Sequence, residues 1–364
     1  MSANSVSRND ILKFIYIIIL VFSMISILIL SGCSNETLEP PNNTNGLEYV
    51  TPETVGYSSL KLDTVKQFTE TSGYDAVMAL YDGKVFFSWG QIDKNYWCHS
   101  IRKPFLSALY GIYTANGNIN LDKTIEELGI DDIPSLTQNE KQARVRDLIK
   151  SRSGIYHEAA AEDSAMIATR PPRGSHPPNT FFYYNNWDFN VAGVIFRQET
   201  GFDIFEEFKR KIADPIGMQD FNVDECFYQY ELNKSLHPAY PFRMSARDMA
   251  RFAVLYQKNG NWNGNQIIPV DWIADSIIPY SIEDSTSGAG YGYMWKLIPA
   301  ESPAAQLIGG HSVFYHTGLG GVQAMIIIPD LKLVIIERTN TDGSFINKDV
   351  GMELGLMIIN SKIL

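Results

Sequence analysis

The sequence contains few of the residues that bind metals or build disulfide frameworks. Its 364 residues include three cysteines and six histidines. Neither H-x-x-x-H nor C-x-x-C spacing occurs, and such spacings bring metal ligands together on a helix or in a tight turn. We therefore expect no metal site and a chemistry that needs no cofactor.

Basic residues are scarce as well. The chain has 30 Lys and Arg residues against 41 Asp and Glu residues, a formal net charge of −11. Lys and Arg form no run longer than the three residues 209–211, whereas proteins that bind phosphate backbones need larger basic clusters. We therefore expect no nucleic acid partner. The apolar content of 45% is that of an ordinary globular protein with a sizeable core.

The chain has only one long hydrophobic run, residues 14–30, which follows Arg8 and Lys13 and precedes Ser31-Gly32-Cys33. This order is typical of an export signal. Small residues before a cysteine resemble the lipobox of bacterial lipoproteins, which implies cleavage before Cys33 and attachment of lipid to it. The alternative is an uncleaved transmembrane anchor, because 17 residues lie near the lower limit for spanning a bilayer. Both interpretations place the body of the protein outside the cytoplasmic membrane.

The N-terminal part therefore divides into a lipoprotein signal peptide, residues 1–32, and a flexible tether, residues 33–48, which lacks apolar periodicity. Residues 49–362 are expected to form one domain. Within it, Cys98 and Cys226 could pair in an oxidising compartment, but spacing alone does not show pairing. We favour two buried, unpaired thiols.

The pattern of the domain changes from strands to helices and back. Residues 76–89 contain two apolar runs around an Asp-Gly pair, which is a strong hairpin signal. Helical periodicity dominates from about residue 118 to 280, where Ser245 begins one helix with the S-x-x-D pattern of a capping box. Strand patterns return from residue 290, and residues 344–361 indicate a closing helix.

These patterns predict an α+β fold, an antiparallel sheet flanked by helices with a mostly helical inserted lobe. The sheet lobe would comprise about residues 49–117 and 285–362, and the helical lobe about residues 118–284. We expect the functional site between the two lobes, where clefts form preferentially.

The candidate site begins with Ser100-x-x-Lys103, although Ser58-x-x-Lys61 has the same spacing among unrelated polar residues. Ser100 precedes an apolar row at helical spacing, with proline in the first turn, where it is tolerated. We therefore predict Ser100 at a helix N-terminus, whose positive end and free N–H groups can hold a developing oxyanion.

Lys103 follows Ser100 by about one helical turn, so the two side chains can touch. An amine can take a proton from a hydroxyl only if burial or a neighbouring cation lowers its pKa. The prediction therefore requires a buried Lys103. For an isolated motif, an exposed lysine near a helix start is the commoner case.

Two further motifs follow. Tyr184 and Asn186 form a Y-x-N pattern before a helical run, where the phenol could transfer a proton and the amide could hold a substrate carbonyl. The alternative is aromatic packing, and Tyr183 fits the same pattern one residue earlier. His316-Thr317-Gly318 ends a strand, and the N–H of Leu319 is a candidate oxyanion donor. A simple turn is the alternative there.

In this order the motifs resemble those of the serine β-lactamase and DD-peptidase superfamily, in particular the branch of class C β-lactamases and their esterase relatives. The resemblance covers roughly residues 50–360. Three more stretches carry it: residues 145–155, VRDLIKSRSGI; residues 184–201, YNNWDFNVAGVIFRQETG; and residues 242–252, FRMSARDMARF.

The resemblance implies an acyl-enzyme mechanism with Ser100 as nucleophile. Lys103 and Tyr184 would be the proton-transfer partners, and the amides of Ser100 and Leu319 would form the oxyanion hole. The expected substrate-contacting positions are Asn186, His316, Thr317, Gly318, Tyr156 and Trp295.

Departures from the relatives narrow the expected chemistry. Class A β-lactamases and DD-peptidases carry Lys where this chain has His316, which is mostly neutral near pH 7. The chain also lacks a Ser-Asp-Asn triplet and an obvious class A deacylation glutamate, so Tyr184 would have to help activate water. Residues 183–188, YYNNWD, resemble 6-aminohexanoate-dimer hydrolases.

The basic loop at residues 170–178 could contact an anionic part of the substrate or be a solvated surface loop.

The sequence thus predicts an extracytoplasmic serine hydrolase tethered to a membrane through Cys33. It would cleave a small-molecule or peptide-like ester or amide without metal or organic cofactor. Two alternatives remain open. One is a penicillin-binding-like sensor or cell-wall-binding lipoprotein without turnover, and the other is a true β-lactamase or D-amino-acid peptidase.

Overall fold

The computed structural model describes residues 46–342 and 350–363. The predicted signal peptide, Cys33, most of the predicted tether and residues 344–349 of the predicted closing helix lie outside this part of the chain. Within it, no helix combines the length and hydrophobicity needed to cross a bilayer.

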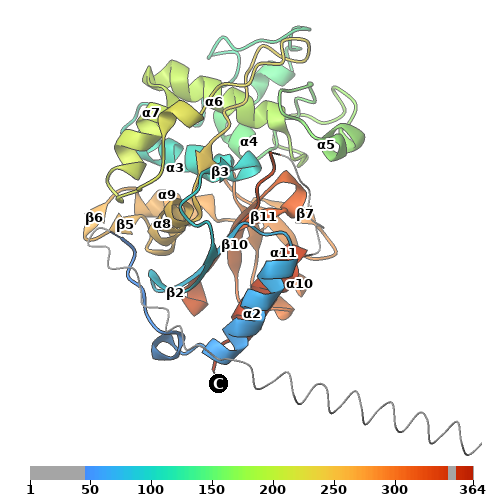
Figure 1. Cartoon of the computed structure of the whole chain (residues 1–364). Coiled ribbons are helices and arrows are strands. Elements are labelled where there is room, and N and C mark those ends of the chain that lie inside the picture. Colours follow the sequence, from blue (N-terminus) through green and yellow to red (C-terminus); the bar gives the residue numbers. More distant parts are fainter. Residues whose placement is uncertain (1–45, 343–349, 364) are drawn as a thin grey trace, which may run out of the picture. The chain divides into compact units, whose positions relative to one another are not determined.

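An eight-stranded antiparallel sheet is the centre of the domain, in the order β2-β1-β12-β11-β10-β9-β8-β7 (Figure 1). Its strands are β1 (Ala76–Tyr81), β2 (Lys84–Gly90), β7 (Ser281–Asp284), β8 (Ala289–Tyr291), β9 (Lys296–Ile298), β10 (Val313–Gly318), β11 (Gln323–Ile328) and β12 (Leu333–Arg338). The N-terminal hairpin pairs with the last strand, so both ends of the domain build one sheet. The predicted α+β fold is confirmed.

The hairpin β1–β2 turns at the Asp-Gly pair that the sequence indicates. Asp82 has φ +50° and Gly83 has φ +88°. Two successive residues with positive φ match the twist of a tight two-residue hairpin, and an Asp-Gly pair adopts them at low cost.

The central strand β12 is buried on both faces of the sheet. Leu333 and Ile335 enter a core with helices α2 (Ser59–Thr71) and α11 (Val350–Asn360). Val334 and Ile336 enter the larger core on the opposite face, which includes α8 (Ala246–Gln257). This alternation explains why the strand reads as a continuous apolar run rather than an alternating one.

The inserted lobe is mainly helical, as predicted. Its helices above the sheet in Figure 1 are α4 (Val145–Ile149), α5 (Ser164–Thr169), α6 (Asn186–Thr200) and α7 (Ile204–Phe208). Helix α3 (Arg102–Ala115) packs with α6 and α7 although it lies in the segment assigned to the sheet lobe. Two further helices are α9 (Val270–Ser276) and α10 (Pro303–Gln306). Two small strand pairs lie outside the main sheet: β3 (Tyr96–Trp97) with β4 (Arg243–Met244), and β5 (Asn261–Trp262) with β6 (Asn265–Gln266).

The lobe boundaries differ in detail from the prediction. Strand β7 begins at Ser281, inside the segment assigned to the helical lobe. Helix α8 also packs against the sheet although it lies within the insertion. Both differences arise because pairing and packing partners far along the chain, rather than local periodicity, decide to which lobe a segment belongs.

Helix α8 begins at Ser245, but its capping box is only half formed. The Ser245 hydroxyl accepts a hydrogen bond from the N–H of Asp248 at 3.2 Å. The Asp248 carboxylate instead accepts hydrogen bonds from the N–H groups of Gln219, Asp220 and Phe221. The second half of the motif is therefore used to hold a distant loop against the helix.

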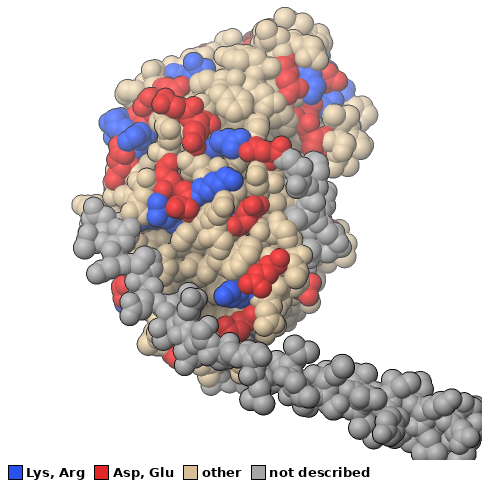
Figure 2. All heavy atoms as spheres, viewed as in Figure 1, with Lys and Arg blue, Asp and Glu red and all other residues tan. Residues whose placement is uncertain are grey.

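The surface charges and the thiols fit an acidic protein without disulfides in the described part. On the face drawn in Figure 2, Lys and Arg are interspersed with Asp and Glu. Cys98 is a buried free thiol and Cys226 a half-buried one. Burial raises the pKa of both thiols, so both stay protonated near pH 7.

Candidate active site

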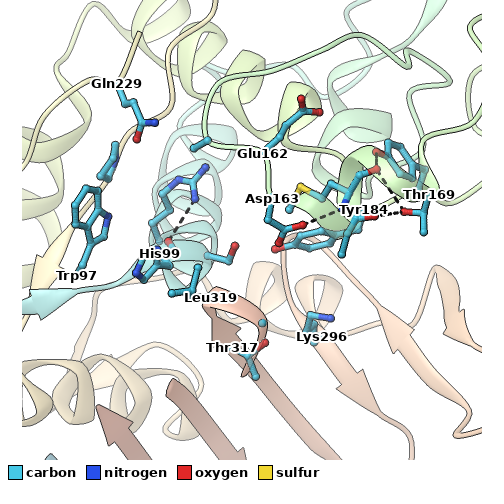
Figure 3. Close-up of a pocket in the computed structure, with 18 of the residues that line it drawn as sticks. Trp97, His99, Glu162, Asp163, Thr169, Tyr184, Gln229, Lys296, Thr317 and Leu319 are labelled. Carbon is cyan, nitrogen blue, oxygen red and sulfur yellow. Dashed lines mark hydrogen bonds between the residues drawn. The ribbon is translucent and has the colours of Figure 1, made fainter. Parts of the chain in front are cut away.

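A cleft of about 580 Å³ lies where the helical lobe meets the ends of β9 and β10. Trp97, His99 and Gln229 lie on one side of it, and Glu162, Asp163 and Tyr184 on the other (Figure 3). Lys296, Thr317 and Leu319 border it from the sheet (Figure 3). The site thus lies between the lobes, where the sequence analysis expected it.

Ser100 lines this cleft from a single 3₁₀ turn, His99–Ile101, that leads into α3. The preceding residue, His99, has φ +47°, an uncommon conformation for a residue other than glycine. Such strain persists where surrounding contacts impose it, often at functional sites. Here buried side chains hold the incoming segment: Arg338 donates to the carbonyl of Tyr96 at 2.8 Å and Gln323 to that of Trp97 at 2.8 Å.

Lys103 directs its amine at Ser100. Its Nζ donates to the Ser100 Oγ at 2.8 Å, and the lysine is 0% exposed. The amine also lies 4.6 Å from the ring centroid of Tyr184 and 4.7 Å from that of Phe189. Aromatic faces favour the charged amine, but burial outweighs them and sets the pKa of Lys103 well below its usual value. The nearby charges of Arg102 and Lys296 lower that pKa further.

The second S-x-x-K match has a different role. Ser58 is the N-cap of α2, where its hydroxyl accepts a hydrogen bond from the N–H of Lys61 at 3.4 Å. Lys61 is exposed and donates to the carbonyl of Asn360 at 2.9 Å. This motif is therefore a helix cap, and neither of its two residues is among those that line the cleft.

Tyr184, on the loop before α6, lies next to Ser100 and Lys103. Its side chain is half-buried and lines the cleft. Its hydroxyl is buried and makes no hydrogen bond to the described residues. Burial raises the pKa of Tyr184, and the nearby Ser100 hydroxyl offsets only part of that effect. Burial therefore favours the neutral phenol over the phenolate at Tyr184.

Residues 151–155 hold the Tyr184 loop in place. The Ser151 hydroxyl donates to the carbonyl of Tyr183 at 2.7 Å and accepts from the N–H of Asn185 at 2.9 Å. Ser153 donates to the carboxylate of Asp188, in the first turn of α6, at 2.5 Å. The SRSGI stretch of the sequence thus fixes the loop that carries the phenol.

The third motif lies in β10 behind the cleft. His316 is 0% exposed, and its Nδ1 lies 2.9 Å from the carbonyl oxygen of Thr317. Burial and then the adjacent Lys103 lower the pKa of His316 well below its usual value, so the ring is neutral. A side chain at Gly318 would place its Cβ 2.9 Å from the carbonyl oxygen of Cys98. Gly318 is therefore needed so that β10 can approach the segment that carries Ser100.

Two backbone N–H groups remain available at the cleft. No hydrogen bond within the described residues engages the N–H of Ser100 or of Leu319. Both residues line the cleft, and Leu319 has φ +45°. Two free N–H groups beside a nucleophile have the character of an oxyanion hole.

Several expected substrate contacts are not at the cleft wall. Of the six substrate-contacting positions, Thr317 alone lines the cleft within the described residues. Asn186 donates to the carbonyl of Ala161 at 2.5 Å and so shapes the wall indirectly. Tyr156 bonds His176 at 3.1 Å, and Trp295 packs in the core against Tyr256. An aromatic side chain in sequence does not show on which face it lies, so these two positions could not be decided before the fold was known.

The basic loop at residues 170–178 does not present free cations to the cleft. Arg170 pairs with Glu162, and Arg173 pairs with Glu140 at 2.8 Å. Its arginines therefore hold the lobe together.

Among the cleft residues that the motifs did not indicate, three carry basic side chains: His99, Arg102 and Lys296. Arg102 stands inside the S-x-x-K motif, so its position was a usable signal. Lys296 is paired with Tyr315 across β9 and β10, and only the strand register reveals it. His99 stacks on Trp97, and burial followed by the charge of Arg102 lowers its pKa to about 4.

Comparisons with known proteins agree with this architecture. The family profile described as Beta-lactamase matches residues 64–350. No curated protein sequence matches the chain. The octameric penicillin-binding protein homologue from Pyrococcus abyssi is 19% identical and has a TM-score of 0.62, with 84% of this chain and 77% of that one covered. A protein described as a 6-aminohexanoate-dimer hydrolase from Bacillus anthracis is 21% identical, with a TM-score of 0.61 and 81% of each chain covered.

The D-alanine carboxypeptidase AmpC from Burkholderia cenocepacia is also similar, with 15% identity, a TM-score of 0.60, and coverage of 83% of this chain and 99% of that one. At these identities the likeness establishes the fold. The family profile spans most of the domain, and the chain therefore belongs to the Beta-lactamase family. Its fold is that of the serine β-lactamases and transpeptidases, a family of serine hydrolases.

Proposed function

We propose that the protein hydrolyses an ester or amide through an acyl-enzyme on Ser100 while a lipid on Cys33 tethers it to a membrane. The observation that carries the enzymatic part is the 2.8 Å contact between the Ser100 hydroxyl and the fully buried amine of Lys103. Burial lowers the pKa of the amine well below its usual value and so favours the neutral form, which is the form that can accept a proton. The tether rests on the signal and lipobox pattern of the sequence.

The geometry supports a simple order of steps. The Lys103 amine takes the Ser100 proton as Oγ attacks the substrate carbonyl, and the N–H groups of Ser100 and Leu319 stabilise the oxyanion. Tyr184 gives its phenol proton to the leaving oxygen or nitrogen and regains one from the Lys103 ammonium, so that the amine is neutral again before water attacks. Water then attacks the acyl-Ser100 ester and gives a proton to Lys103, which releases the acid and restores the hydroxyl.

The third motif supports ester or amide substrates over β-lactams. A neutral, buried His316 cannot supply the fixed cation that Lys supplies at this position in the relatives. Lys296 lies on the neighbouring strand, but its amine is paired with Glu283. Structural neighbours include a 6-aminohexanoate-dimer hydrolase and EstCE1, a hydrolase with promiscuous acyltransferase activity.

A fluorophosphonate probe tests the nucleophile directly. The purified protein and a Ser58→Ala control should be labelled, whereas Ser100→Ala should not. A panel of p-nitrophenyl esters, anilides and nitrocefin then measures turnover. Labelling at Ser100 without hydrolysis of any substrate would favour the non-turnover sensor, and rapid nitrocefin hydrolysis would favour a true β-lactamase.

A further inference from the structure

We propose that Arg102 binds an anionic group of the substrate, so that this site prefers esters or amides that carry a carboxylate near the scissile bond. The inference rests on the proposed hydrolysis at Ser100 and extends it to a substrate class.

Arg102 is a buried cation with unused hydrogen-bonding capacity. It lines the same cleft as Ser100 and is 4% exposed. Its two hydrogen bonds are long, 3.3 Å to the carbonyl of His99 and 3.4 Å to the side-chain oxygen of Asn190. Its Nε has no partner, and no carboxylate of the described residues lies within ion-pair distance. A guanidinium has five N–H donors, so most of this group is left unsatisfied.

The guanidinium is also held in a fixed orientation. Its Cζ lies over the ring of Tyr240, 4.9 Å from the centroid, and the side chain lines the cleft. A planar, oriented guanidinium is suited to binding a carboxylate with two parallel hydrogen bonds.

A second buried arginine shows the contrast. Arg338 is 0% exposed and likewise has no carboxylate partner in the described part of the chain. Its guanidinium nevertheless donates to the carbonyls of Tyr96 and Met244, at 2.8 and 3.1 Å, and to the side chain of Gln323. The two arginines share an unpartnered Nε, but the terminal nitrogens of Arg338 have close oxygen partners supplied by the fold, whereas those of Arg102 have only the two long hydrogen bonds. A buried cation whose donors lack close partners is unfavourable, and an anion from outside would relieve that cost.

The carboxylates of the cleft are already engaged. Glu162 pairs with Arg170, Glu231 with Lys234, and Glu283 with Lys296. Asp163 is exposed and caps α5, where it accepts the N–H of Met166 at 2.9 Å. Solvent screens this one unpaired carboxylate, whereas Arg102 is shielded from solvent. An incoming anion therefore meets one buried and unpaired cation beside the nucleophile.

Matched substrates test the preference. One pair is p-nitrophenyl hexanoate and mono-p-nitrophenyl adipate, which place a neutral end or a carboxylate on the acyl side. The other pair is 3-carbamoylphenyl butyrate and 3-carboxyphenyl butyrate, which do the same on the leaving-group side. The quantity measured is the ratio of kcat/KM for the anionic over the neutral member, after subtraction of spontaneous hydrolysis.

We expect Arg102→Gln to lower this ratio by about tenfold or more in one of the two pairs, the scale of a charge-assisted hydrogen bond. The pair that responds shows on which side of the scissile bond the anion lies. Arg102→Lys, which keeps the charge but not the planar donors, should retain only part of the preference. Lys296→Gln, which also removes a cation from the cleft wall, should change the ratio much less.

The outcomes separate the inference from the function on which it rests. If the wild type hydrolyses the neutral esters but Arg102→Gln keeps the wild-type ratio in both pairs, the anion site is wrong and the hydrolase stands. An equal drop for Lys296→Gln would replace the Arg102 site by a general positive potential. If no neutral or anionic ester is hydrolysed, the proposed function itself fails.

Discussion

At the scale of single residues, burial gives a common cation an uncommon role. Lys103 is a lysine near a helix start, where most lysines are exposed and charged. In this fold its amine is enclosed by Tyr184 and Phe189 and points at Ser100. Desolvation disfavours the ammonium form, and Arg102 and Lys296 add repulsion. The charge of His316 is suppressed for the same two reasons, burial and a neighbouring cation.

Removal of either proton-transfer partner should therefore slow turnover strongly. We expect Lys103→Ala and Tyr184→Phe each to reduce kcat/KM by roughly 10² or more, the scale of general acid–base catalysis. Ester hydrolysis by purified variants measures this, with Lys61→Ala as the matched control from the other S-x-x-K match. A near-normal rate in either variant would remove that residue from the mechanism.

The pH dependence of the same reaction provides a second test of the role of Lys103. Because the pKa of Lys103 is lowered, activity should rise with pH as the amine loses its proton, along a limb centred below the usual lysine value of about 10.4. The pH profile of kcat/KM measures the limb. It should be absent from the residual activity of Lys103→Ala, and its persistence there would assign it to another group.

At the scale of elements, the strand β12 carries a buried acid between the sheet and its covering helices. Glu337 is 0% exposed, and the Tyr74 hydroxyl reaches one of its oxygens at 3.5 Å. Its other oxygen has no partner among the described residues. Burial raises the pKa of Glu337 to about 8, so the folded strand holds a protonated carboxyl near neutral pH.

This acid should make stability fall as pH rises. A glutamate in the unfolded chain has a pKa of about 4.3, so the folded state holds one more proton than the unfolded state between that value and about 8. The stabilisation by the protonated Glu337 is complete below about pH 4.3 and is lost as the pH rises to about 8. Over this range the free energy of unfolding should fall by up to about 1.4 kcal/mol per pH unit.

Urea unfolding between pH 5 and 8 measures this slope, and we expect Glu337→Gln to flatten it. Glu301→Gln, a change at an exposed glutamate, is the control. Equal slopes in the wild type and in Glu337→Gln would show that the strand does not hold the proton.

At the scale of the whole molecule, the cleft exists only because two lobes meet. Its walls come from the helical insertion and from β9 and β10, and its nucleophile lies on the turn before α3. Glycine at position 318 and buried Arg338 bring the sheet against that turn. The proposed membrane tether, in contrast, rests on the sequence pattern around Cys33, which lies outside the described residues.

The proposed lipid on Cys33 predicts that a substitution of this residue changes where the protein is found in the cell. Cys33→Ala should abolish incorporation of a palmitate analogue and prevent formation of the mature lipid-anchored protein, because the thiol that would carry the lipid is absent. Labelling and membrane fractionation in a bacterial host measure this, with Cys226→Ala as the control. An unlabelled wild type that stays in the membrane would indicate the uncleaved transmembrane anchor instead.

Much of the fold was predictable because its signals are local. The Asp-Gly turn of the first hairpin, the Ser245 cap of α8 and the periodicity around Ser100 each depend on neighbours in sequence. The side-chain positions of the site were harder. Trp295 and Tyr156 were expected at the cleft and lie elsewhere, whereas Lys296 lines the cleft although no motif predicted it. Which face a side chain occupies depends on strand register and packing, which short motifs do not encode.

The sequence by itself determined the fold class, the family and the order of the three motifs, because turn chemistry, helix caps and hydrophobic period act over a few residues. Only the tertiary structure decided that Lys103 is buried against Ser100, that His316 is neutral and that Arg102 is left without an anion. Those properties depend on solvent exclusion and on charges brought together from distant segments, and both arise when the lobes pack.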